Sequence, residues 1–439
     1  MPAKFEKACH IIHTLKQAGH EAFLVGGCVR DRVLGIESPD YDIATSALPD
    51  QVQSLFRRNV AVGAHFGVII VMDGDDAFEV ATFRADDRYL DGRRPVSVRF
   101  VSAQEDVERR DFTINGLLFD IDSGKILDYV GGLQDLADRR IRTIGNAADR
   151  FTEDKLRLMR AVRFAARFGF SIDPATLHAI HALATEITCV SWERIRDEIL
   201  KMLMNRNPHS ALRLLDSTGL LAVVLPEVHR LKGVRQPEEF HPEGDVFEHT
   251  LRLLELMDQP TGFLRNETLA LSALLHDIGK PQTFYEATDR IRFHNHPAVG
   301  SRIAASVLKR LRCSNQLIDD VCHCVDNHMN FINVTKMRPN RLKRFLRSPV
   351  IEEELELHRL DCLASHGGIE NYVFLKQQQK ELGRERISPP PLISGKRLIE
   401  MGFSPGPQFK QILAAVEDLQ LEEKIATPQE AEKFISENF

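Results

Sequence analysis

The chain has 439 residues, of which 43% are hydrophobic and 27% charged, an ordinary composition for a soluble protein of two to four domains. Its formal net charge of −6 excludes a globally basic surface, so contacts with nucleic acid would need local basic clusters. Seven cysteines, an odd number, favour reduced thiols and a cytoplasmic location. No apolar run reaches the length of a membrane span, and the amphipathic N-terminus does not resemble a targeting peptide.

The most informative segment combines a glycine pair with two aspartates. Residues 22–25 are apolar and predict a short buried strand, and Gly26 and Gly27 predict a tight turn at which backbone can approach a ligand. Asp40 and Asp42 begin a second predicted strand, and side chains two residues apart in a strand share a face. Such a carboxylate pair suits Mg²⁺ and a polyphosphate, whereas a solvated acidic strand is the ordinary alternative.

The following segment predicts further short strands, over 66–72 and 78–84, that alternate with helices. This pattern is typical of an α/β or α+β head of about 140 residues. Glu79 is either a third acid beside the aspartates or a partner in an ion pair at a sheet edge. Residues 84–95 are polar, contain glycine and are typical of a mobile loop.

Four motifs in chain order resemble those of class II tRNA nucleotidyltransferases and bacterial poly(A) polymerases. They are Gly-Gly-x-Val-Arg-Asp at 26–31, Asp-Tyr-Asp at 40–42, Arg-Arg-Asp-Phe-Thr-Ile-Asn at 109–115 and Gly-Gly-Leu-x-Asp-Leu at 131–136. Each motif alone is weak, but four in order at compatible spacing are specific. The resemblance implies a polymerase-β-like head followed by helical domains.

A helix predicted to start from an N-cap at Thr152 carries Asp154 and Arg157 three residues apart, on one face. The ordinary explanation is a surface ion pair, but the segment resembles the family's nucleotide-selecting motif. A carboxylate accepts from the exocyclic amine of cytosine or adenine, and a guanidinium donates to ring acceptors. Guanine and uracil place a carbonyl at the amine position, so CTP and ATP are the expected substrates.

Two groups of basic residues are candidates for contacts with RNA phosphate, although solvated helix faces are the usual explanation for such runs. The first continues the same predicted helix and consists of Arg160, Arg163 and Arg167. The second lies further along the chain and consists of Arg338, Arg341, Lys343, Arg344 and Arg347. Arg194 and Arg196, in a segment that resembles the last neck motif of the family, are expected to be structural or to face RNA.

A separate constellation of histidines and aspartates begins near residue 240. His276 and Asp277 close an apolar predicted helix, and together with His249 and Asp361 they resemble the HD phosphohydrolase superfamily. Four such ligands suit a divalent transition metal or Mg²⁺, and His296 and His328 are candidate ligands of a second metal. The resemblance implies activity on cyclic or 3′-terminal phosphates of RNA; an inactive domain that only supports RNA is the alternative.

The resemblance predicts an α+β fold with a mixed sheet in the nucleotidyltransferase head and all-α neck, body, HD and tail domains. The expected boundaries are 1–140 for the head, 141–240 for the neck, 241–370 for the HD domain and 371–439 for the tail.

The expected activity is template-independent addition of CMP and AMP to the 3′ end of tRNA, from CTP and ATP, with release of pyrophosphate. Asp40 and Asp42 would be the catalytic carboxylates and would hold two Mg²⁺ ions. The residues expected to bind nucleotide are Gly26, Gly27, Arg30 and Asp31 at the triphosphate, Arg110, Asp111 and Asn115 at the ribose, and Asp154 and Arg157 at the base.

The sequence leaves several alternatives open. Residues 63–67 replace an Arg-Arg-Phe run that is typical of poly(A) polymerases, which favours the tRNA enzymes, and the complete 84–95 loop disfavours a CC-adding enzyme. An A-adding enzyme and a poly(A) polymerase remain alternatives, as does a phosphohydrolase that acts through the HD site. The intact carboxylate pair disfavours a non-catalytic RNA-binding protein, and the oligomeric state is left open.

Overall fold

The computed structural model describes residues 3–63, 67–86, 98–237, 239, 241–259 and 264–439. The chain forms two compact units, Met1–His229 and Arg230–Phe439. Most of the predicted loop at 84–95, and Ala64 to Phe66 of the segment that distinguishes the poly(A) polymerases, lie outside the described residues. None of the described helices is both long and apolar enough to cross a membrane.

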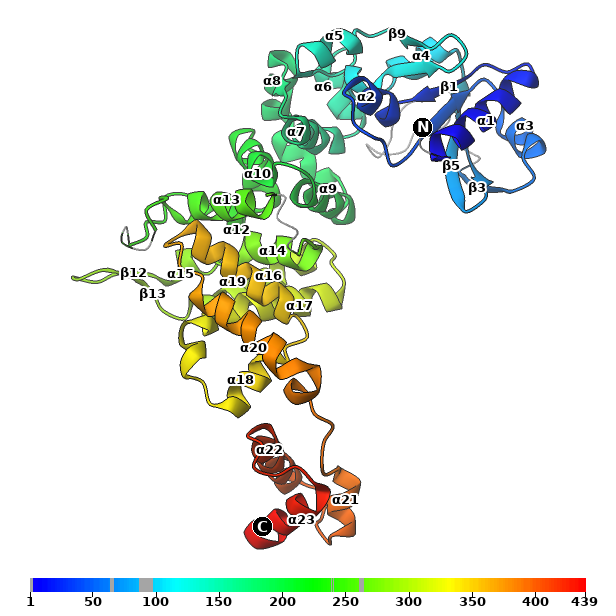
Figure 1. Cartoon of the computed structure of the whole chain (residues 1–439). Coiled ribbons are helices and arrows are strands. Elements are labelled where there is room, and N and C mark those ends of the chain that lie inside the picture. The colour runs from blue at the N-terminus through cyan, green and yellow to red at the C-terminus, as the bar shows by residue number, and fades with distance from the viewer. Residues whose placement is uncertain (1–2, 64–66, 87–97, 238, 240, 260–263) are drawn as a thin grey trace. The chain divides into compact units, whose positions relative to one another are not determined.

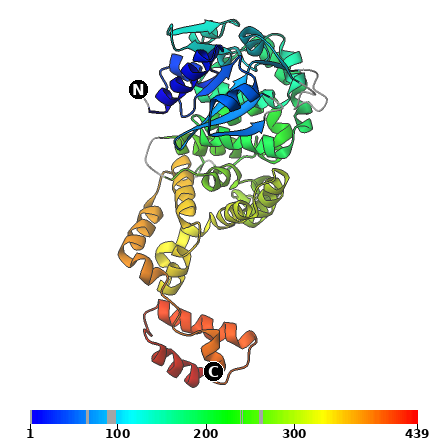
Figure 2. The ribbon, with the colours of Figure 1, turned by 90° about the vertical axis from the view of Figure 1, so that its right-hand side faces the viewer.

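A seven-stranded sheet, in the order β3-β4-β5-β2-β1-β8-β9, forms the first part of unit 1 (Figures 1 and 2). Only the β2–β5 pair is parallel among the described pairs of this sheet, so the predicted mixed sheet is confirmed. The strands are β1 Ala22–Val25, β2 Asp42–Thr45, β3 Asn59–Gly63, β4 Val68–Asp73, β5 Asp76–Thr82, β8 Leu117–Asp120 and β9 Lys125–Asp128. Apolar side chains of the central strands, among them Ile43, Ile69 and Val80, are fully buried.

Short helices complete the head and fix its loops. They are α1 Ala3–Gln17, α2 Gly27–Val33, α3 Pro49–Leu55, α4 Ala103–Glu108, the 3-10 turn η2 Thr113–Asn115 and α5 Gly132–Ala137; β6 Arg84–Asp86 pairs antiparallel with β7 Val98–Phe100. A Cβ atom on Gly132 would lie 2.2 Å from the Thr113 carbonyl oxygen. Only glycine therefore allows α5 to approach η2, which carries Asn115.

The remainder of unit 1 is helical apart from a two-residue strand pair, β10 Arg140–Ile141 with β11 Ser171–Ile172. Its elements are α6 Ala147–Glu153, α7 Leu156–Phe168, α8 Pro174–Leu183, η3 Ala184–Cys189, α9 Trp192–Met204, α10 Pro208–Ser217, α11 Leu220–Val224 and α12 Pro226–His229. The predicted helix start at Thr152 is wrong, because Thr152 lies inside α6 and the chain is extended at Asp154. The Asp154 carboxylate accepts from the Leu156 N–H (3.1 Å), which favours a new helix start over continuation of α6.

Unit 2 is built from helices around α14, Glu267–Leu275, with one hairpin, β12 Phe284–Glu286 and β13 Ile291–Phe293. Because α14 is apolar on all sides, it is buried and packs against α13, α17 and α19. The other elements are α13 Val246–Met257, α15 Lys280–Thr283, α16 His296–Arg310, α17 Asn315–Asn327, η4 Asn330–Lys336, α18 Pro339–Leu346, α19 Ile351–Ala364 and α20 Glu370–Ile387. The last helices, α21 Gly395–Glu400, α22 Pro407–Leu421 and α23 Pro428–Asn438, share a small apolar core that includes Leu398, Ile412 and Ile435.

Candidate active sites

A cavity of about 470 Å³ in unit 1 gathers most of the residues that the sequence assigns to nucleotide binding. Of the predicted set, Asp31 and Asp40 are the two that are not among the residues lining it. The lining residues are Gly26, Gly27, Arg30, Asp42, Arg109, Arg110, Asp111, Asn115, Asp154, Leu156, Arg157, Arg160, Phe164 and Arg194. Five separate segments of the chain, at 26–30, 42, 109–115, 154–164 and 194, therefore converge on one polar cavity.

The glycine pair joins β1 to α2 at one wall of this cavity. Gly26 has a φ of 72°, in the region that favours glycine, and its N–H donates to the Leu117 carbonyl (3.2 Å). A Cβ atom at Gly26 would lie 3.4 Å from Nη1 of Arg110. The turn thus keeps backbone close to an arginine that faces the same cavity, as the binding of a phosphate chain requires.

The carboxylates cluster at the start of β2. The parallel register of β2 and β5 pairs Ile43 with Val80, which brings Glu79 beside Asp42. Desolvation and the negative charge of Glu79, with a smaller contribution from Asp40, raise the pKa of Asp42 to about 6. Asp40 precedes the strand instead of lying in it; its carboxylate is 76% exposed and 2.7 Å from Nζ of Lys4. Carboxylates that converge in this way are a suitable donor set for a divalent cation, which would offset their mutual repulsion.

A buried polar network behind the cavity holds the arginines in place. Arg30 donates to Asn115 Oδ1 (2.5 Å), Asn115 donates to Asp111 Oδ1 (3.0 Å), and Arg160 donates to Asp111 Oδ2 (2.9 Å). Burial alone would raise the pKa of Asp111, but Arg160 and Asn115 hold it well below its usual range. Arg160, which the sequence assigns to RNA, therefore lies at the nucleotide cavity.

The predicted base-selecting pair lies in this cavity, with Asp154 in the extended link between α6 and α7 and Arg157 in the first turn of α7. Arg157 is fixed by Glu153 (2.7 Å) and by the Arg109 carbonyl oxygen (3.2 Å). Asp154 Oδ2 accepts from Arg194 (2.7 Å), which comes from α9. The sequence gives Arg194 only a structural or RNA-facing role, and nothing in its local pattern indicates that it reaches Asp154.

The remaining members of the first basic group point into the protein. Arg163 is buried and donates to Glu198, which is also buried, at 2.6 Å. Arg167 lies 3.6 Å from Asp31 and over the Phe168 ring. These contacts stabilise the packing of α7, so the placement of Arg163 gives no support to an RNA contact there.

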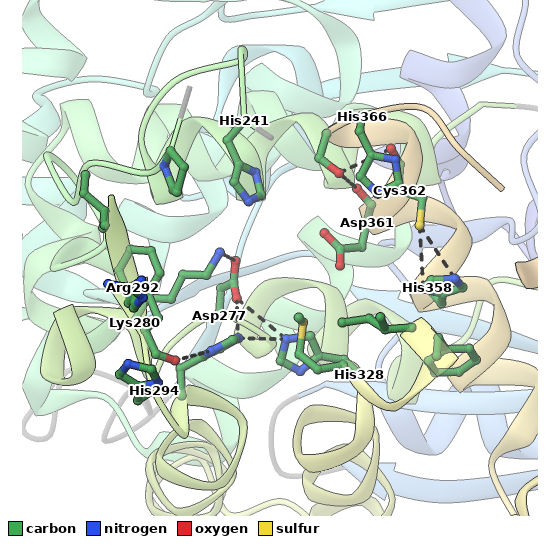
Figure 3. Close-up of a pocket in the computed structure, with 18 of the residues that line it drawn as sticks. His241, Asp277, Lys280, Arg292, His294, His328, His358, Asp361, Cys362 and His366 are labelled. Atoms are coloured by element: carbon green, nitrogen blue, oxygen red, sulfur yellow. Dashed lines mark hydrogen bonds and ion pairs between the residues drawn. The ribbon is translucent and has the colours of Figure 1, made fainter. Parts of the chain in front are cut away.

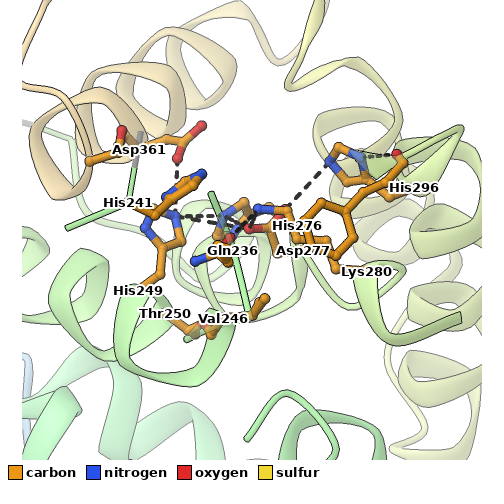
Figure 4. A network of polar contacts seen from close by, with 12 residues as sticks. Gln236, His241, Val246, His249, Thr250, His276, Asp277, Lys280, His296 and Asp361 are labelled. Atoms are coloured by element: carbon orange, nitrogen blue, oxygen red, sulfur yellow. Dashed lines mark hydrogen bonds and ion pairs between the residues drawn. The ribbon is translucent and has the colours of Figure 1, made fainter. Parts of the chain in front are cut away.

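In unit 2, all six predicted metal ligands of the HD constellation come together. Figure 4 labels His249, His276, Asp277, His296 and Asp361, and Figure 3 labels His328. His249 lies 3.0 Å from Asp361 and 3.3 Å from His276, measured between Nε2 and the facing atom. His296 and His328 present their Nε2 atoms to each other at 3.1 Å. Asp277 lies between the two groups: Oδ2 is 3.3 Å from His276, and Oδ1 is 3.4 Å from His296.

The protonation of His296 and His328 suits metal binding. Nδ1 of His296 faces the Phe293 carbonyl oxygen (2.9 Å) and Nδ1 of His328 faces that of Val325 (2.7 Å), so both Nδ1 atoms are donors. Burial lowers the pKa of His296 and lowers that of His328 to about 3, so both rings are neutral. Two Nε2 lone pairs then face each other beside an Asp277 oxygen, an arrangement that a cation stabilises.

The predicted metal ligands His249 and Asp277 are held by further polar contacts that the sequence does not indicate. Glu243 Oε1 lies 2.6 Å from Nδ1 of His249 and 2.9 Å from Nδ1 of His241. Lys280 is buried, 2.7 Å from Asp277 Oδ2, and donates to Gln236. A cavity of about 560 Å³, the HD pocket, opens over the cluster and includes Asp277, His328 and Asp361 in its lining (Figure 3).

Three family models match the chain. The poly(A) polymerase head domain covers residues 22–142, the probable RNA and SrmB-binding site of polymerase A covers 169–232, and the HD domain covers 246–365. Fold and sites together define a polymerase-type nucleotidyltransferase that carries an HD domain.

Individual relatives narrow this class. The CCA-adding enzyme of Levilactobacillus brevis is 46% identical over 221 residues, which are 50% of this chain and 55% of that protein, so the match spans about half the length of such curated relatives. The crystal structure of the Bacillus stearothermophilus CCA-adding enzyme in complex with CTP is 30% identical, with a TM-score of 0.75 over 100% of this chain and 98% of that chain. The Thermotoga maritima CCA-adding enzyme complexed with tRNA, at 18% identity and a TM-score of 0.59 over 100% of this chain and 96% of that chain, shares the fold. The chain belongs to the CCA-adding enzyme family.

Proposed function

We propose that this chain adds CMP and AMP to the 3′ end of tRNA, from CTP and ATP, and releases pyrophosphate. The observation that carries the proposal is the single cavity that combines the Asp42 carboxylate, a set of arginines and the Asp154–Arg157 pair. The relative solved with CTP has the same fold over its whole length. We also propose a cytoplasmic location, since all seven cysteines are thiols.

The head residues divide the work of nucleotide transfer. Asp40 and Asp42, with Glu79 beside them, would hold two Mg²⁺ ions. When bound, such ions acidify the terminal 3′-hydroxyl of the RNA and offset the charge of the leaving pyrophosphate. Arg30 and Arg110, beside the glycine turn, would bind the triphosphate and orient it for in-line attack. The selecting pair would accept cytosine or adenine and reject bases that leave the Asp154 carboxylate without a donor.

The test is incorporation of labelled CTP and ATP, singly and together, on tRNA transcripts that end before CCA, after C and after CC. We expect each transcript to be extended until it ends in CCA and no further. We expect the Asp42→Asn variant to be inactive and to retain the thermal stability of the wild type. ATP incorporation only on the CC end would indicate an A-adding enzyme, and a long A-tail a poly(A) polymerase. No incorporation on any acceptor would overturn the transferase proposal.

We propose a second activity, hydrolysis of phosphate esters at RNA ends by the HD site. The supporting observation is the position of Asp277, whose two oxygens face two separate groups of ligand atoms. We expect protein that is stripped of metal by a chelator and then reloaded with a divalent metal to release phosphate from RNA with a 3′-phosphate end, or to open the ring of RNA with a 2′,3′-cyclic phosphate end. His276→Ala should abolish this activity and leave nucleotide addition intact, whereas Asp42→Asn should have the opposite effect.

We retain the predicted division into head (1–140), neck (141–240), HD domain (241–370) and tail (371–439) as a proposal. The matched ranges 22–142, 169–232 and 246–365 support the first three parts. Limited proteolysis followed by mass spectrometry would locate the junctions.

A further inference from the structure

A second cavity of unit 2 lies next to the HD pocket. It has a volume of about 1000 Å³ and is formed by η4, α18 and one residue of α22. The two cavities share Met329 and Ile332 in their linings, and these two apolar side chains are 40% and 62% exposed. We call the second cavity the basic groove, and a ligand that passes over Met329 and Ile332 would occupy both.

The basic residues of this region divide into two kinds. Lys343 is buried and donates to the Leu421 carbonyl oxygen (2.7 Å), while Arg344 and Arg347 pair with Glu417 of α22 (2.6 and 2.7 Å). These three hold α22 against α18, so part of the predicted basic cluster is structural.

The other cations of the groove are available for a ligand. Lys336, Arg338 and Arg341 line it, are exposed, and make no side-chain ion pair or hydrogen bond with the described part of the chain. The same is true of Arg290, which lies on the β12–β13 hairpin at the HD pocket. The one carboxylate that lines the groove, Asp418, already accepts from Arg344 (2.9 Å). Exposed unpaired cations thus occur on both sides of the apolar residues shared by the two cavities.

Apolar surface lies between these cations. The exposed side chains of Met329 and Ile332 and the half-buried ring of Phe345 line the groove, whereas Phe331, which stacks on His358 with ring centroids 4.3 Å apart, is only 1% exposed and forms the floor beneath them. Positive charge along a groove with interspersed apolar surface is the usual arrangement for single-stranded nucleic acid, because phosphates contact the cations and bases cover the apolar surface.

We propose that the basic groove binds the single-stranded 3′ end of an RNA and directs its terminal phosphate into the HD pocket. This inference rests on the proposed phosphohydrolase activity and specifies its substrate: an RNA strand of several nucleotides instead of a free mononucleotide. Charge complementarity selects this occupant, since a mononucleotide in the HD pocket would leave Lys336, Arg338 and Arg341 without a partner.

The test compares hydrolysis of an octanucleotide with a 2′,3′-cyclic end to that of a 2′,3′-cyclic mononucleotide by full-length protein loaded with Mn²⁺. For Arg338→Ala/Arg341→Ala, we expect the ratio of the two kcat/KM values to fall roughly tenfold. The plot of log kcat/KM for the octanucleotide against log salt should become shallower by about 1.4, because each single-strand phosphate contact contributes about 0.7. The matched control, Arg384→Ala/Lys396→Ala, removes two exposed cations that line neither cavity and should change neither quantity.

Each remaining outcome decides one proposal. An unchanged ratio and salt slope in the groove variant would overturn the groove while the phosphohydrolase activity stands. If the wild type hydrolyses neither substrate, the phosphohydrolase proposal fails, and the groove is judged by fluorescence anisotropy of a labelled octanucleotide with the same variants and salt series. A shallower salt dependence of octanucleotide binding in Arg338→Ala/Arg341→Ala than in the wild type supports the groove. An unchanged salt dependence overturns it. Competition by polyglutamate as strong as that by unlabelled RNA would also overturn it, in favour of an acidic protein partner.

Discussion

Arg194 offers a sharp test of how the nucleotide cavity is organised. It holds the Asp154 carboxylate at 2.7 Å, and the two side chains are only 21% and 18% exposed. The other Asp154 oxygen accepts from the Leu156 N–H. Arg194→Ala would therefore leave the selecting carboxylate fixed at one oxygen only.

The expected size of the effect follows from this geometry. A hydrogen bond to a charged group contributes about 1.5–3 kcal/mol, and about 1.4 kcal/mol corresponds to a factor of ten. We therefore expect kcat/KM for CTP and for ATP to fall about ten- to hundredfold in Arg194→Ala. The ratio of kcat/KM for CTP to that for UTP should also fall. An Asp154 carboxylate that can rotate away no longer penalises the uracil carbonyl that faces it.

The assay is single-turnover incorporation of CTP, ATP and UTP on transcripts that end before CCA and after CC. Arg206→Ala, an exposed arginine outside the cavity, is the matched control and should behave as the wild type. Arg194→Lys should recover part of the loss, since it keeps the charge. A change of less than twofold in both rate and discrimination for Arg194→Ala would refute the reasoning.

Three further predictions concern stability and metal binding. Arg163→Ala should lower the free energy of unfolding by about 3 kcal/mol, because it leaves Glu198 buried without its main partner, and a double change of both residues to leucine should restore most of the urea midpoint. Burial lowers the pKa of His358 to about 4, so the neutral ring stabilises the fold above its unfolded pKa of 6.5, and this stability is lost as the pH falls towards 4. The free energy of unfolding of His358→Gln, taken from urea denaturation, should thus decline less than that of the wild type over that range, by up to about 3 kcal/mol, and parallel pH profiles would contradict this. Glu243→Gln should weaken metal binding at His249 about ten- to hundredfold in calorimetric titrations of the metal-free protein, and unchanged affinity would show that this contact does not orient the ligand.

The sequence by itself determined the features that depend on local pattern. The glycine turn before α2, the central strands and the apolar helix that ends at His276 follow from spacing and from residue type. The order of the motifs was enough to identify the family and to select the six residues that the structure brings together in the HD constellation. These signals are short-range, so they survive in a single sequence without any knowledge of packing.

Only the tertiary structure decided which side chains meet across long stretches of chain. It paired Asp154 with Arg194, drew Arg160 to Asp111 and buried Arg163, and it placed the two oxygens of Asp277 toward different ligand groups. Even the break at Asp154 reflects a competition between a side-chain cap and continued helix. Local periodicity cannot determine such contacts, because they depend on how helices distant in sequence pack and on which charges that packing removes from water.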